Sequence, residues 1–332
     1  MSNKNKVSVS VIIPTLNRPR TLNRTLESIC SGDAMPLQVI VIDQSDKDKI
    51  RIENQELCRK YNDYIQVQYI YQKIQSSTMA RNCGMKLVEQ PYILFCDDDV
   101  SIKSDTFREL ESIMLRPDIS MVAGIDLNGG LGHSLSGYLF GRKSFINRHI
   151  GHVTLSVYGR FPAAKITKEV ETQWAMGFFF CIKKEYVDRW DVKWDEQLTS
   201  YAYAEDLDFS YSYYKKSLEE GLKCILTPKV AVYHMCSREW RISTYKSVAM
   251  NVINREYLSY KHFKTPFSRL ATRWSNVGEF FIKLLRRDCP LDVVCAQLSC
   301  DLHRKELQRG HIAAGVYERG KKRQQVQKLG EN

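Results

Sequence analysis

The sequence predicts an α/β fold in which a mostly parallel sheet is covered by helices on both faces. Short apolar runs rich in β-branched residues alternate with stretches at helical spacing over the first hundred residues. The resulting order is strand, helix, strand, helix, strand, helix, strand, which favours parallel strands joined by crossover helices. Beyond residue 237 the pattern becomes helical and basic, and this predicts a helical C-terminal extension.

The first four strands are expected where apolar residues run together or alternate with polar ones, at residues 7–13, 39–42, 65–71 and 92–96. The first strand ends at Pro14, the second at Asp43 and the fourth at three aspartates. Helices are expected around residues 22–29 and 79–89, where apolar residues recur at helical spacing.

The middle of the chain is less regular. Further helices are expected at residues 104–115 and 205–220, and further strands at residues 121–125, 174–182 and 223–233. Leu127 to Gly159 shows weak periodicity, and a loop of that length in a compact domain is usually functional. We expect this segment to contain a loop that excludes water from a reacting ligand.

Polar residues follow the strands at the points where the strands end. Thr15, Asn17 and Arg18 follow the first strand, Asp43 ends the second, and Asp97 to Asp99 end the fourth. In open α/β sheets the ligand lies beyond the carboxyl ends of the strands. These side chains are therefore expected to share one site.

The aspartate triplet predicts a metal site. Three adjacent carboxylates repel one another at the end of a buried strand, and a hard divalent ion such as Mg²⁺ or Mn²⁺ would neutralise them. Side chains two apart in an extended chain point the same way, so Asp97 and Asp99 are expected to share a face. The simpler alternative is an acidic turn at a strand end.

Other candidates lie outside this triplet. Glu205 and Asp206 open a predicted helix, where acids also serve as caps, but a carboxylate there could act as a general base. His234 follows a strand and is either a structural residue or one that faces a metal or phosphate. Arg81, near a helix start, could pair with a phosphate or a base.

Together these motifs resemble glycosyltransferase family 2, whose members have the Rossmann-like GT-A fold. The resemblance covers about Val7 to Ser237. Its matching pieces stand in the order typical of the family: Val11 to Arg18, Val39 to Asp43, Ala80 to Gly84, Cys96 to Asp99, Glu205-Asp206 and Pro228 to His234.

The resemblance implies a role for each matched position. It implies that Asp206 is the catalytic base with Glu205 beside it, that Asp99 and His234 bind the metal, and that Trp174 to Phe179 border the acceptor site. The donor-binding positions implied are Pro14, Thr15, Asn17, Arg18, Asp43, Arg81, Asp97 and Asp98, and the acceptor positions are Trp174 and Gly177.

The chain departs from the family pattern at three places. Ala204 stands where the family usually has Gly, and Ser212 stands where it often has Arg. Gln44-Ser45-Asp46 replaces the usual run after the second strand. These departures leave the sugar and the nucleotide of the donor open.

The function predicted is an inverting, metal-dependent glycosyltransferase. It would move a sugar from a nucleotide-sugar, UDP-linked or linked to another nucleoside diphosphate, to a hydroxyl of a glycan or lipid-linked acceptor in cell-surface polysaccharide biosynthesis. Residues 1–237 would form the catalytic domain and residues 238–332 a basic helical region. Alternatives weighed are a sugar nucleotidyltransferase, a basic nucleic-acid- or membrane-binding protein, and a catalytically dead scaffold.

The bulk composition limits the setting. The chain has 332 residues and no apolar stretch long enough to span a membrane, and Val7 to Ile13 is interpreted as a strand rather than a signal peptide. Ten cysteines without a C-x-x-C pair indicate reduced thiols. A cytoplasmic location is expected, with room for peripheral attachment to the inner face of a membrane.

The positive charge lies in the C-terminal region. The net charge is +11, and the residues from Arg238 onward contain 19 Lys and Arg against 9 Asp and Glu. Phe267 to Leu284 carries an apolar stripe spaced 3, 4, 3, 4, 3 and flanked by basic residues. Such a helix could lie on an anionic membrane surface or pack on the body of the protein. No nucleic-acid partner is expected, and a homo-oligomer is left open.

Overall fold

The computed structural model describes residues 5–129, 134–142, 149–162, 166–199, 203–235, 244–313 and 315–318. The chain divides into two compact units. The first comprises Met1–His133, Lys143–Val153 and Gly159–Trp240, and the second comprises Ser134–Arg142, Thr154–Tyr158 and Arg241–Asn332. The division predicted at residue 237 did not foresee the two short segments that join the C-terminal helices, and as a functional division it stays a prediction.

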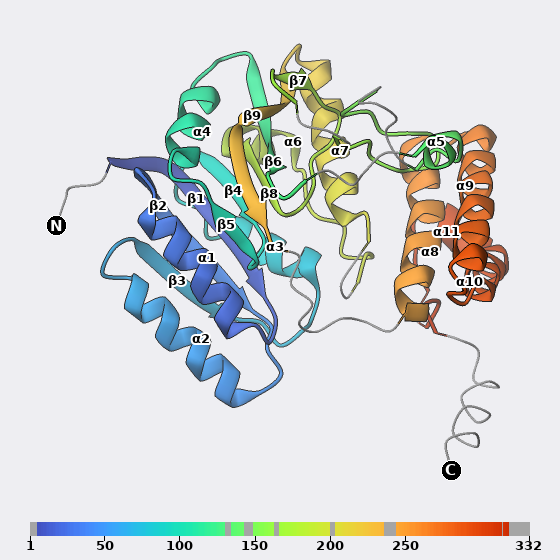
Figure 1. The fold of residues 1–332 in the computed structure, drawn as a ribbon, viewed down its shortest axis with the longest axis horizontal. Coiled ribbons are helices and arrows are strands. Elements are labelled where there is room, and N and C mark those ends of the chain that lie inside the picture. The colour runs from blue at the N-terminus through green and yellow to red at the C-terminus, as the bar shows by residue number, and fades with distance from the viewer. Residues whose placement is uncertain are drawn as a thin grey trace. The chain divides into compact units, whose positions relative to one another are not determined.

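The first unit is built on one sheet with helices against it (Figure 1). The strand order is β3-β2-β1-β4-β8-β6-β9-β5, with β7 paired to β9. The strands are β1 Asn5–Thr15, β2 Ala34–Asp43, β3 Gln66–Tyr71, β4 Tyr92–Cys96, β5 Val100–Ile102, β6 Ile119–Asp126, β7 Val170–Glu171, β8 Phe179–Lys183 and β9 Lys223–His234.

Four of the eight strand pairs among the described residues are parallel, and three of these join β3, β2, β1 and β4, where the sequence predicts parallel strands. The parallel pairs are β2 with β3, β1 with β2, β1 with β4, and β6 with β9. The antiparallel strand β8 lies between β4 and β6. The carboxyl ends of β1, β2 and β4 therefore meet at one edge of the sheet, and this is where the polar residues lie.

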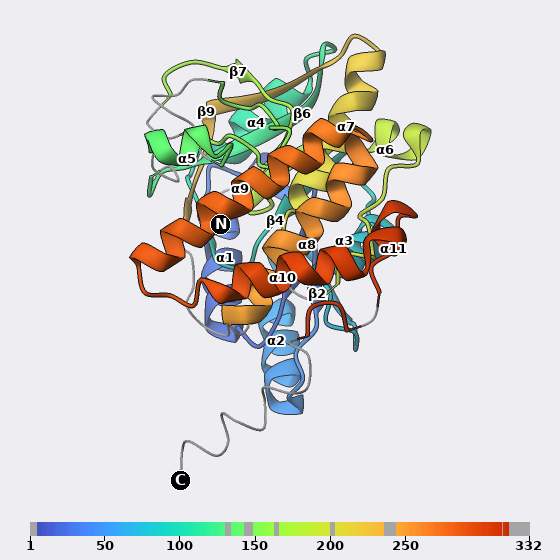
Figure 2. The same cartoon turned by 90° about the vertical axis from the view of Figure 1, so that its right-hand side faces the viewer.

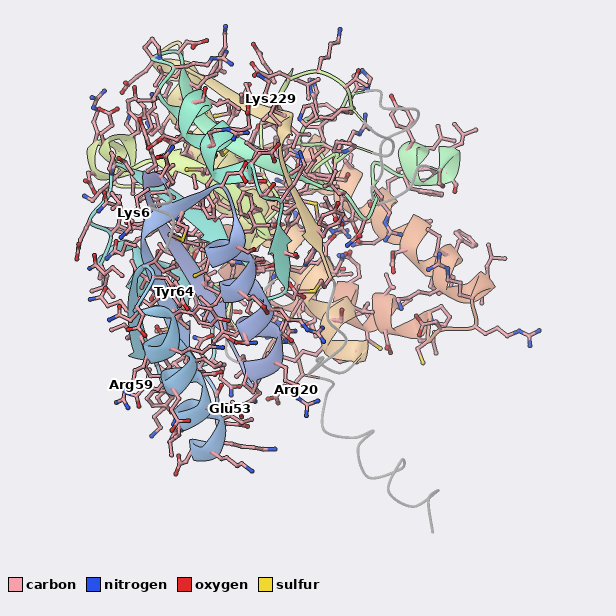
Figure 3. The ribbon with its side chains drawn as sticks, turned by 60° about the vertical axis from the view of Figure 1, so that its left-hand side comes forward. Lys6, Arg20, Glu53, Arg59, Tyr64 and Lys229 are labelled. Atoms are coloured by element: carbon pink, nitrogen blue, oxygen red, sulfur yellow. The ribbon has the colours of Figure 1, made fainter. Side chains whose placement is uncertain are left out.

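The helices of this unit place their apolar stripes on the sheet. In α1, Leu22, Leu26 and Ile29 are fully buried, and Pro19 begins the helix at a position that needs no backbone donor. In α2 the charged side chains of Glu53 and Arg59 point away from the body (Figure 3). The helices are α1 Pro19–Ser31, α2 Asp48–Tyr61, α3 Ser77–Met85, α4 Thr106–Met114, α6 Lys184–Trp190 and α7 Glu205–Glu219.

One expected strand was wrong at its start. The sequence predicts a strand over residues 174–182, but β8 begins at Phe179. The backbone before it bonds to side chains instead of a neighbouring strand. Trp174 N donates to Thr172 Oγ1, and Ala175 N donates to Ser210 Oγ at 3.0 Å. An apolar run cannot reveal hydrogen bonds to side chains that lie far away in the sequence.

The second unit is helical. It contains α5 Leu135–Leu139, α8 Thr244–His262, α9 Pro266–Leu285, α10 Leu291–Leu302 and α11 Arg304–Gln308. The central helix α8 is buried along most of its described length, and α9 and α10 lie on the same side of it (Figure 2). The indole of Trp274 donates to Leu139 O at 3.1 Å, which holds α5 against α9. Within the described residues, no helix is long and apolar enough to cross a membrane.

Candidate active site

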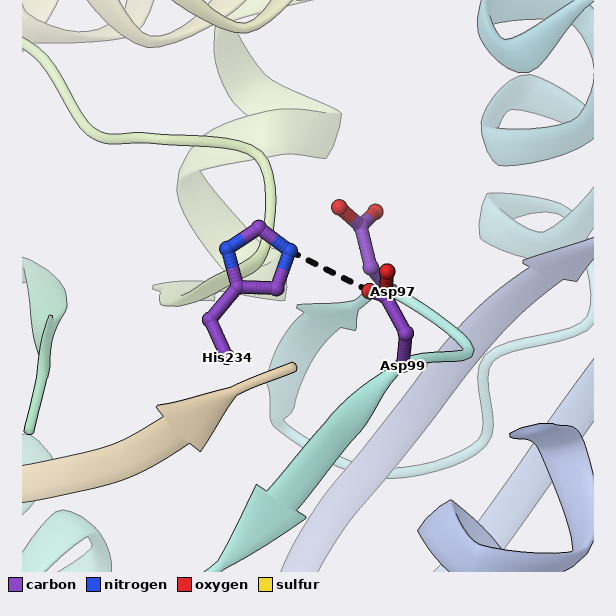
Figure 4. Close-up of side chains that lie close together, drawn as sticks. All are labelled: Asp97, Asp99 and His234. Atoms are coloured by element: carbon purple, nitrogen blue, oxygen red, sulfur yellow. Dashed lines mark ion pairs between the residues drawn. The ribbon is translucent and has the colours of Figure 1, made fainter. Parts of the chain in front are cut away.

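The aspartate triplet at the end of β4 splits into two directions. Asp97 and Asp99 turn toward His234, and ligand atoms of these three residues lie within 4.8 Å of one another (Figure 4). Asp98 turns toward the end of β1, where Thr15 Oγ1 donates to it at 2.7 Å and Arg18 Nη1 lies 3.1 Å away. Asp97 directly follows β4, and Asp98 and Asp99 lie in the turn before β5, so this turn sets the two directions.

The environment of Asp98 is dry. The residue is 4% exposed, and burial raises the pKa of its carboxyl to about 7, although Arg18 and Thr15 oppose the shift and the neighbouring carboxylates add to it. Thr25 Oγ1 also donates to its backbone carbonyl at 2.7 Å. Asp98 thus joins the end of β4 to the segment after β1.

The group Asp97, Asp99 and His234 has the donor chemistry of a divalent cation site. His234 Nε2 lies 3.2 Å from Asp99 Oδ1. Burial lowers the pKa of His234. The hydrogen bond to Asp99 and the nearby carboxylates raise it by more than burial lowers it, so the net shift of the pKa is upward. Two carboxylates and an imidazole suit Mn²⁺, and a nearly buried carboxylate cluster gains most from a cation. The residues present therefore fit the expected metal.

Three strands hold His234 in place. Its backbone N donates to Asp126 Oδ1 at 3.0 Å, and Val100 pairs with it across β5 and β9. Its imidazole stacks on Phe178 with ring centroids 5.0 Å apart and an angle of 18° between planes. Phe178 O also accepts from Asp97 N at 3.0 Å. The sequence places Phe178 in the segment expected to border the acceptor site, but it does not predict the contact with His234.

Arg81 of α3 links the triplet to the acids at the start of α7. Its Nη2 lies 3.0 Å from Asp97 Oδ1, and its Nη1 lies 3.2 Å from Glu205 Oε1. The guanidinium lies over the ring of Trp194 at 4.6 Å. Burial lowers the pKa of Arg81, but Asp97, Glu205 and Asp206 raise it more, so the group stays charged.

The paired acids sit where α7 begins. Asp206 Oδ2 accepts from Gly177 N at 2.9 Å, and Oδ1 accepts from Leu207 N at 2.8 Å. Burial is the main cause that raises the pKa of Asp206 and of Glu205, and Arg81 opposes both shifts. A carboxylate with a raised pKa is a better proton acceptor than an ordinary one.

Ala204, which precedes these acids, adopts a left-handed backbone with φ 66° and ψ 17°. Such a conformation favours Gly because a Cβ atom crowds the following carbonyl. The departure from the family pattern at this position is therefore a non-glycine residue held in a conformation that suits glycine.

The expected donor residues of β1 and β2 lie close together. Asn17 N donates to Ser45 Oγ at 2.9 Å, and Gln44 N donates to Thr15 O at 2.9 Å, next to Pro14. Asn17 also adopts a left-handed backbone, with φ 58°. This turn places the end of β1 beside the end of β2.

Asp43 is fully buried at the end of β2. Its Oδ1 accepts from Ser45 N at 2.8 Å, and its Oδ2 accepts from Asn54 Nδ2 and from the Tyr69 hydroxyl, both at 2.9 Å. A contact between Asp43 and the nucleotide of the donor would therefore add to hydrogen bonds that both carboxylate oxygens already accept inside the protein. Asp43 orders the turn that carries Asn17 and Ser45.

The two expected acceptor residues differ in their surroundings. Gly177 lies between Arg81 and Asp206: a Cβ atom added there would lie 3.2 Å from Arg81 Nη2 and 3.3 Å from Asp206 Cβ. Trp174 is only 6% exposed, and its indole packs so closely on Gly159 that a Cβ there would overlap the ring. Gly177 thus lies among the candidate catalytic side chains, whereas Trp174 is buried against Gly159 and Phe161.

Comparison with known proteins agrees with this geometry. Residues 10–157 match the family described as "Glycosyl transferase family 2". Over 286 residues the chain is 21% identical to poly(ribitol-phosphate) beta-N-acetylglucosaminyltransferase TarP of Staphylococcus aureus (strain N315), which covers 84% of this chain and 79% of TarP. These matches support a family 2 glycosyltransferase.

Other relatives match shorter regions or the fold alone. Validoxylamine A glucosyltransferase of Streptomyces hygroscopicus subsp. limoneus is 32% identical over 96 residues, and the chain spans only 20% of its length. That match covers 28% of this chain. The mannosyltransferase PcManGT from Pyrobaculum calidifontis, solved in complex with GDP-Man and Mn²⁺, aligns with a TM-score of 0.53 and 13% identity.

The alignment with PcManGT covers 92% of this chain and 82% of that one. At such low identity the likeness concerns the fold. The prediction of a GT-A-type α/β fold is therefore confirmed, as is the prediction of the family. The individual roles of the family 2 site residues stay predictions, now supported by where the structure places them.

Proposed function

We propose that this family 2 glycosyltransferase is an inverting enzyme that transfers a sugar from a nucleotide-sugar to a hydroxyl of a glycan or lipid-linked acceptor. One observation carries the proposal: Arg81 joins the ligand group of Asp97, Asp99 and His234 to the acids Glu205 and Asp206. A group that neutralises a leaving diphosphate and a group that accepts a proton thus lie on either side of one guanidinium.

The donor is proposed to lie along the ends of β1, β2 and β4. Backbone and side-chain groups of Thr15, Asn17 and Arg18 would face the nucleoside, and a divalent cation bound by Asp97, Asp99 and His234 would supply positive charge beside the diphosphate. PcManGT was solved with GDP-Man and Mn²⁺, which supports Mn²⁺ as the first metal to test, with Mg²⁺ second. A uridine diphosphate sugar is the first donor to test.

The acceptor would be activated from the side of α7. Asp206 would take the proton of the acceptor hydroxyl, whose oxygen forms the new bond at the anomeric carbon. The bond from that carbon to the diphosphate breaks, and the leaving group departs with the electron pair. Gly177 N holds one oxygen of Asp206, which leaves the direction of the carboxylate fixed. Single displacement of this kind inverts the anomeric centre.

The setting follows from the same proposal. Residues 1–237 would bind the donor and perform transfer, and the basic C-terminal region would contact an acceptor or a membrane at its cytoplasmic face. TarP is by its name an enzyme that acts on poly(ribitol-phosphate), which supports a polymeric acceptor in cell-surface polysaccharide biosynthesis. A lid within Leu127 to Gly159 stays a prediction, since residues 130–133 and 143–148 lie outside the described residues.

The other functions considered have less support than sugar transfer. A sugar nucleotidyltransferase and a nucleic-acid-binding protein were suggested by an acidic α/β site and a basic tail. The family match and the site geometry account for the acids without either of them. A dead scaffold would not need a charged bridge between two sets of carboxylates.

The test is calorimetry with a panel of nucleoside diphosphates and their sugars, with and without Mn²⁺. We expect metal-dependent binding of one nucleotide by the native chain and loss of that binding in Asp99→Ala. Asp188→Ala is the control, because Asp188 is an exposed acid on α6 paired with Lys184. If no nucleotide binds, or if Asp99→Ala binds as well as the native chain, the proposed donor site is wrong.

A further inference from the structure

Helix α9 carries its apolar side chains outward. Trp274 is 55% exposed, Phe281 51% and Leu285 84%. Phe267 and Leu270 continue the same stripe toward the start of the helix. The sequence predicts that this stripe either lies on a membrane surface or packs on the protein. Among the described residues of the stripe, only Trp274 makes a polar or ring contact with another element, through Leu139 and Phe140 at α5.

The opposite side of α9 is polar and buried. Ser268 Oγ donates to Leu155 O at 2.6 Å, and Asn276 Nδ2 donates to Gln297 Oε1 at 2.8 Å. Thr272 Oγ1 reaches Glu256 Oε2 at 3.4 Å. Turning the helix to bury its apolar stripe would break these buried hydrogen bonds, each of which is costly to lose. The outward direction of the stripe is therefore built into the unit.

Helix α10 repeats the arrangement. Leu291 is 56% exposed, Leu298 57% and Leu302 83%, while Ala296 and Cys300 on the other side are buried. Both helices lie on the same side of α8 (Figure 2). We call the exposed apolar side chains of the two helices the α9–α10 face: Phe267, Leu270, Trp274, Val277, Phe281, Leu284, Leu285, Leu291, Val294, Leu298 and Leu302.

The positive charge around this face favours an anionic partner. Residues 264–309 contain nine Lys and Arg against five Asp and Glu. Arg286 and Arg287 are exposed between α9 and α10, and Arg304 and Lys305 are exposed on α11. A second copy would bring the same excess of positive charge against itself, whereas an anionic surface would be attracted. Residues 319–332 add five Lys and Arg against one Glu.

We propose that the α9–α10 face docks this unit onto an anionic lipid surface. Trp, Phe and Leu side chains would enter the interface between headgroups and acyl chains, and the cations around them would contact the lipid phosphates. The attachment would be peripheral, because only the side chains of a folded unit would enter the lipid layer while its helices stay outside. Binding requires no catalysis, so it is independent of the proposed sugar transfer.

The test is co-sedimentation of the full chain with vesicles of phosphatidylcholine, with and without phosphatidylglycerol. We expect binding that needs phosphatidylglycerol and weakens as salt rises. The double variant Leu285→Ser/Leu302→Ser should bind on the order of tenfold more weakly. Arg286→Gln should bind about fivefold more weakly. Both leucines are more than four-fifths exposed, so their replacement leaves the core intact.

The matched control is Leu115→Ser/Leu218→Ser, which replaces two leucines of the first unit that are 66% and 60% exposed. It should bind vesicles like the native chain. Equal binding to phosphatidylcholine alone would overturn the requirement for anionic lipid. If Leu285→Ser/Leu302→Ser binds fully while Lys321→Gln/Lys322→Gln/Arg323→Gln loses binding, the C-terminal tail binds the vesicles. That result would overturn the proposal that the α9–α10 face does so. Sedimentation equilibrium that shows an oligomer dissolved by Leu285→Ser/Leu302→Ser would assign the face to a second copy and likewise overturn the proposal.

Discussion

The two units each bury an arginine, and they compensate its charge in different ways. Arg81 in the first unit is 4% exposed and faces the carboxylates of Asp97 and Glu205. Arg255 in the second unit is 0% exposed and donates to neutral oxygens, among them Ser156 O at 3.1 Å and Asn251 O at 3.0 Å. The ring of Tyr158 lies beneath it, 4.3 Å from the guanidinium carbon.

The difference separates chemistry from architecture. A buried cation enclosed by carbonyl and amide oxygens fixes the packing of helices and has nothing to exchange. A buried cation between carboxylates of two different elements can bind a ligand when a metal ion or a substrate takes over its contacts with those carboxylates. Arg81 is thus expected to govern activity, and Arg255 is expected to govern stability.

The largest effect is expected from Arg81→Met. Loss of the guanidinium leaves the carboxylates of Asp97 and Glu205 without the positive charge that offsets their repulsion, and sugar transfer should fall about 10²- to 10³-fold. Transfer rate at saturating donor is the measurement, with the circular dichroism melt as the check on folding. Arg189→Met is the control, because Arg189 is an exposed residue of α6 paired with Glu220. Transfer that stays within twofold of native would contradict the distinction.

The next effect is expected from Arg255→Met. The change leaves several buried acceptors without a donor and should cost about 3 kcal/mol of unfolding free energy. Hydrogen exchange should rise in α8 and α9, while nucleotide binding by calorimetry stays near native. Arg269→Met serves as the comparison, since Arg269 is only partly buried against Tyr260, and should cost less than about 1 kcal/mol. Loss of nucleotide binding in Arg255→Met without a loss of stability would reverse the assignment.

The smallest effect is expected at Ala204. Glycine at this left-handed position relieves a crowded Cβ and should raise the unfolding free energy by up to about 1 kcal/mol. Urea denaturation measures it. Ala80→Gly, within α3, should instead lower stability by about 1 kcal/mol because its backbone is helical. A loss of stability in Ala204→Gly would mean that the backbone strain is compensated elsewhere.

Much of the first unit could be predicted because its signals are local. Apolar runs that end at Pro14, Asp43 and the aspartate triplet mark strands that the structure places side by side. The sequence predicts Asp97 and Asp99 on one face, and their ligand atoms do lie together, although a turn after β4 and not strand alternation brings them there. Both inferences need only neighbouring residues and the geometry of a strand.

The parts that could not be predicted depend on distant partners. Before β8, Ala175 N donates to the Ser210 hydroxyl, 35 residues away, and no run of apolar residues reveals that bond. Phe178 precedes β8 and stacks on His234 at the end of β9, and nothing in the sequence near either residue reveals that contact. The burial of Asp43 likewise depends on Asn54 and Tyr69 of other elements.

Periodicity also left the direction of a helix open. The stripe of α1 and the stripe of α9 have similar spacing, yet Leu22 and Leu26 face the sheet whereas Trp274 and Phe281 face outward. Spacing predicts that one side of a helix is apolar. Which side is buried is decided by what the polar side can bond to, and for α9 those partners are residues of α8 and α10.

The outward stripe of α9 has a consequence for directed evolution. A library selected for yield of dispersed protein would reward Ser or Gln in place of Phe267, Phe281 and Leu285, because these changes remove exposed apolar area without touching the packed core. A library selected for growth of the producing cell would retain the apolar residues if their place of work is a lipid surface. If polar residues are enriched at these three positions in the first library and depleted in the second, the apolar residues serve attachment to a surface and not folding.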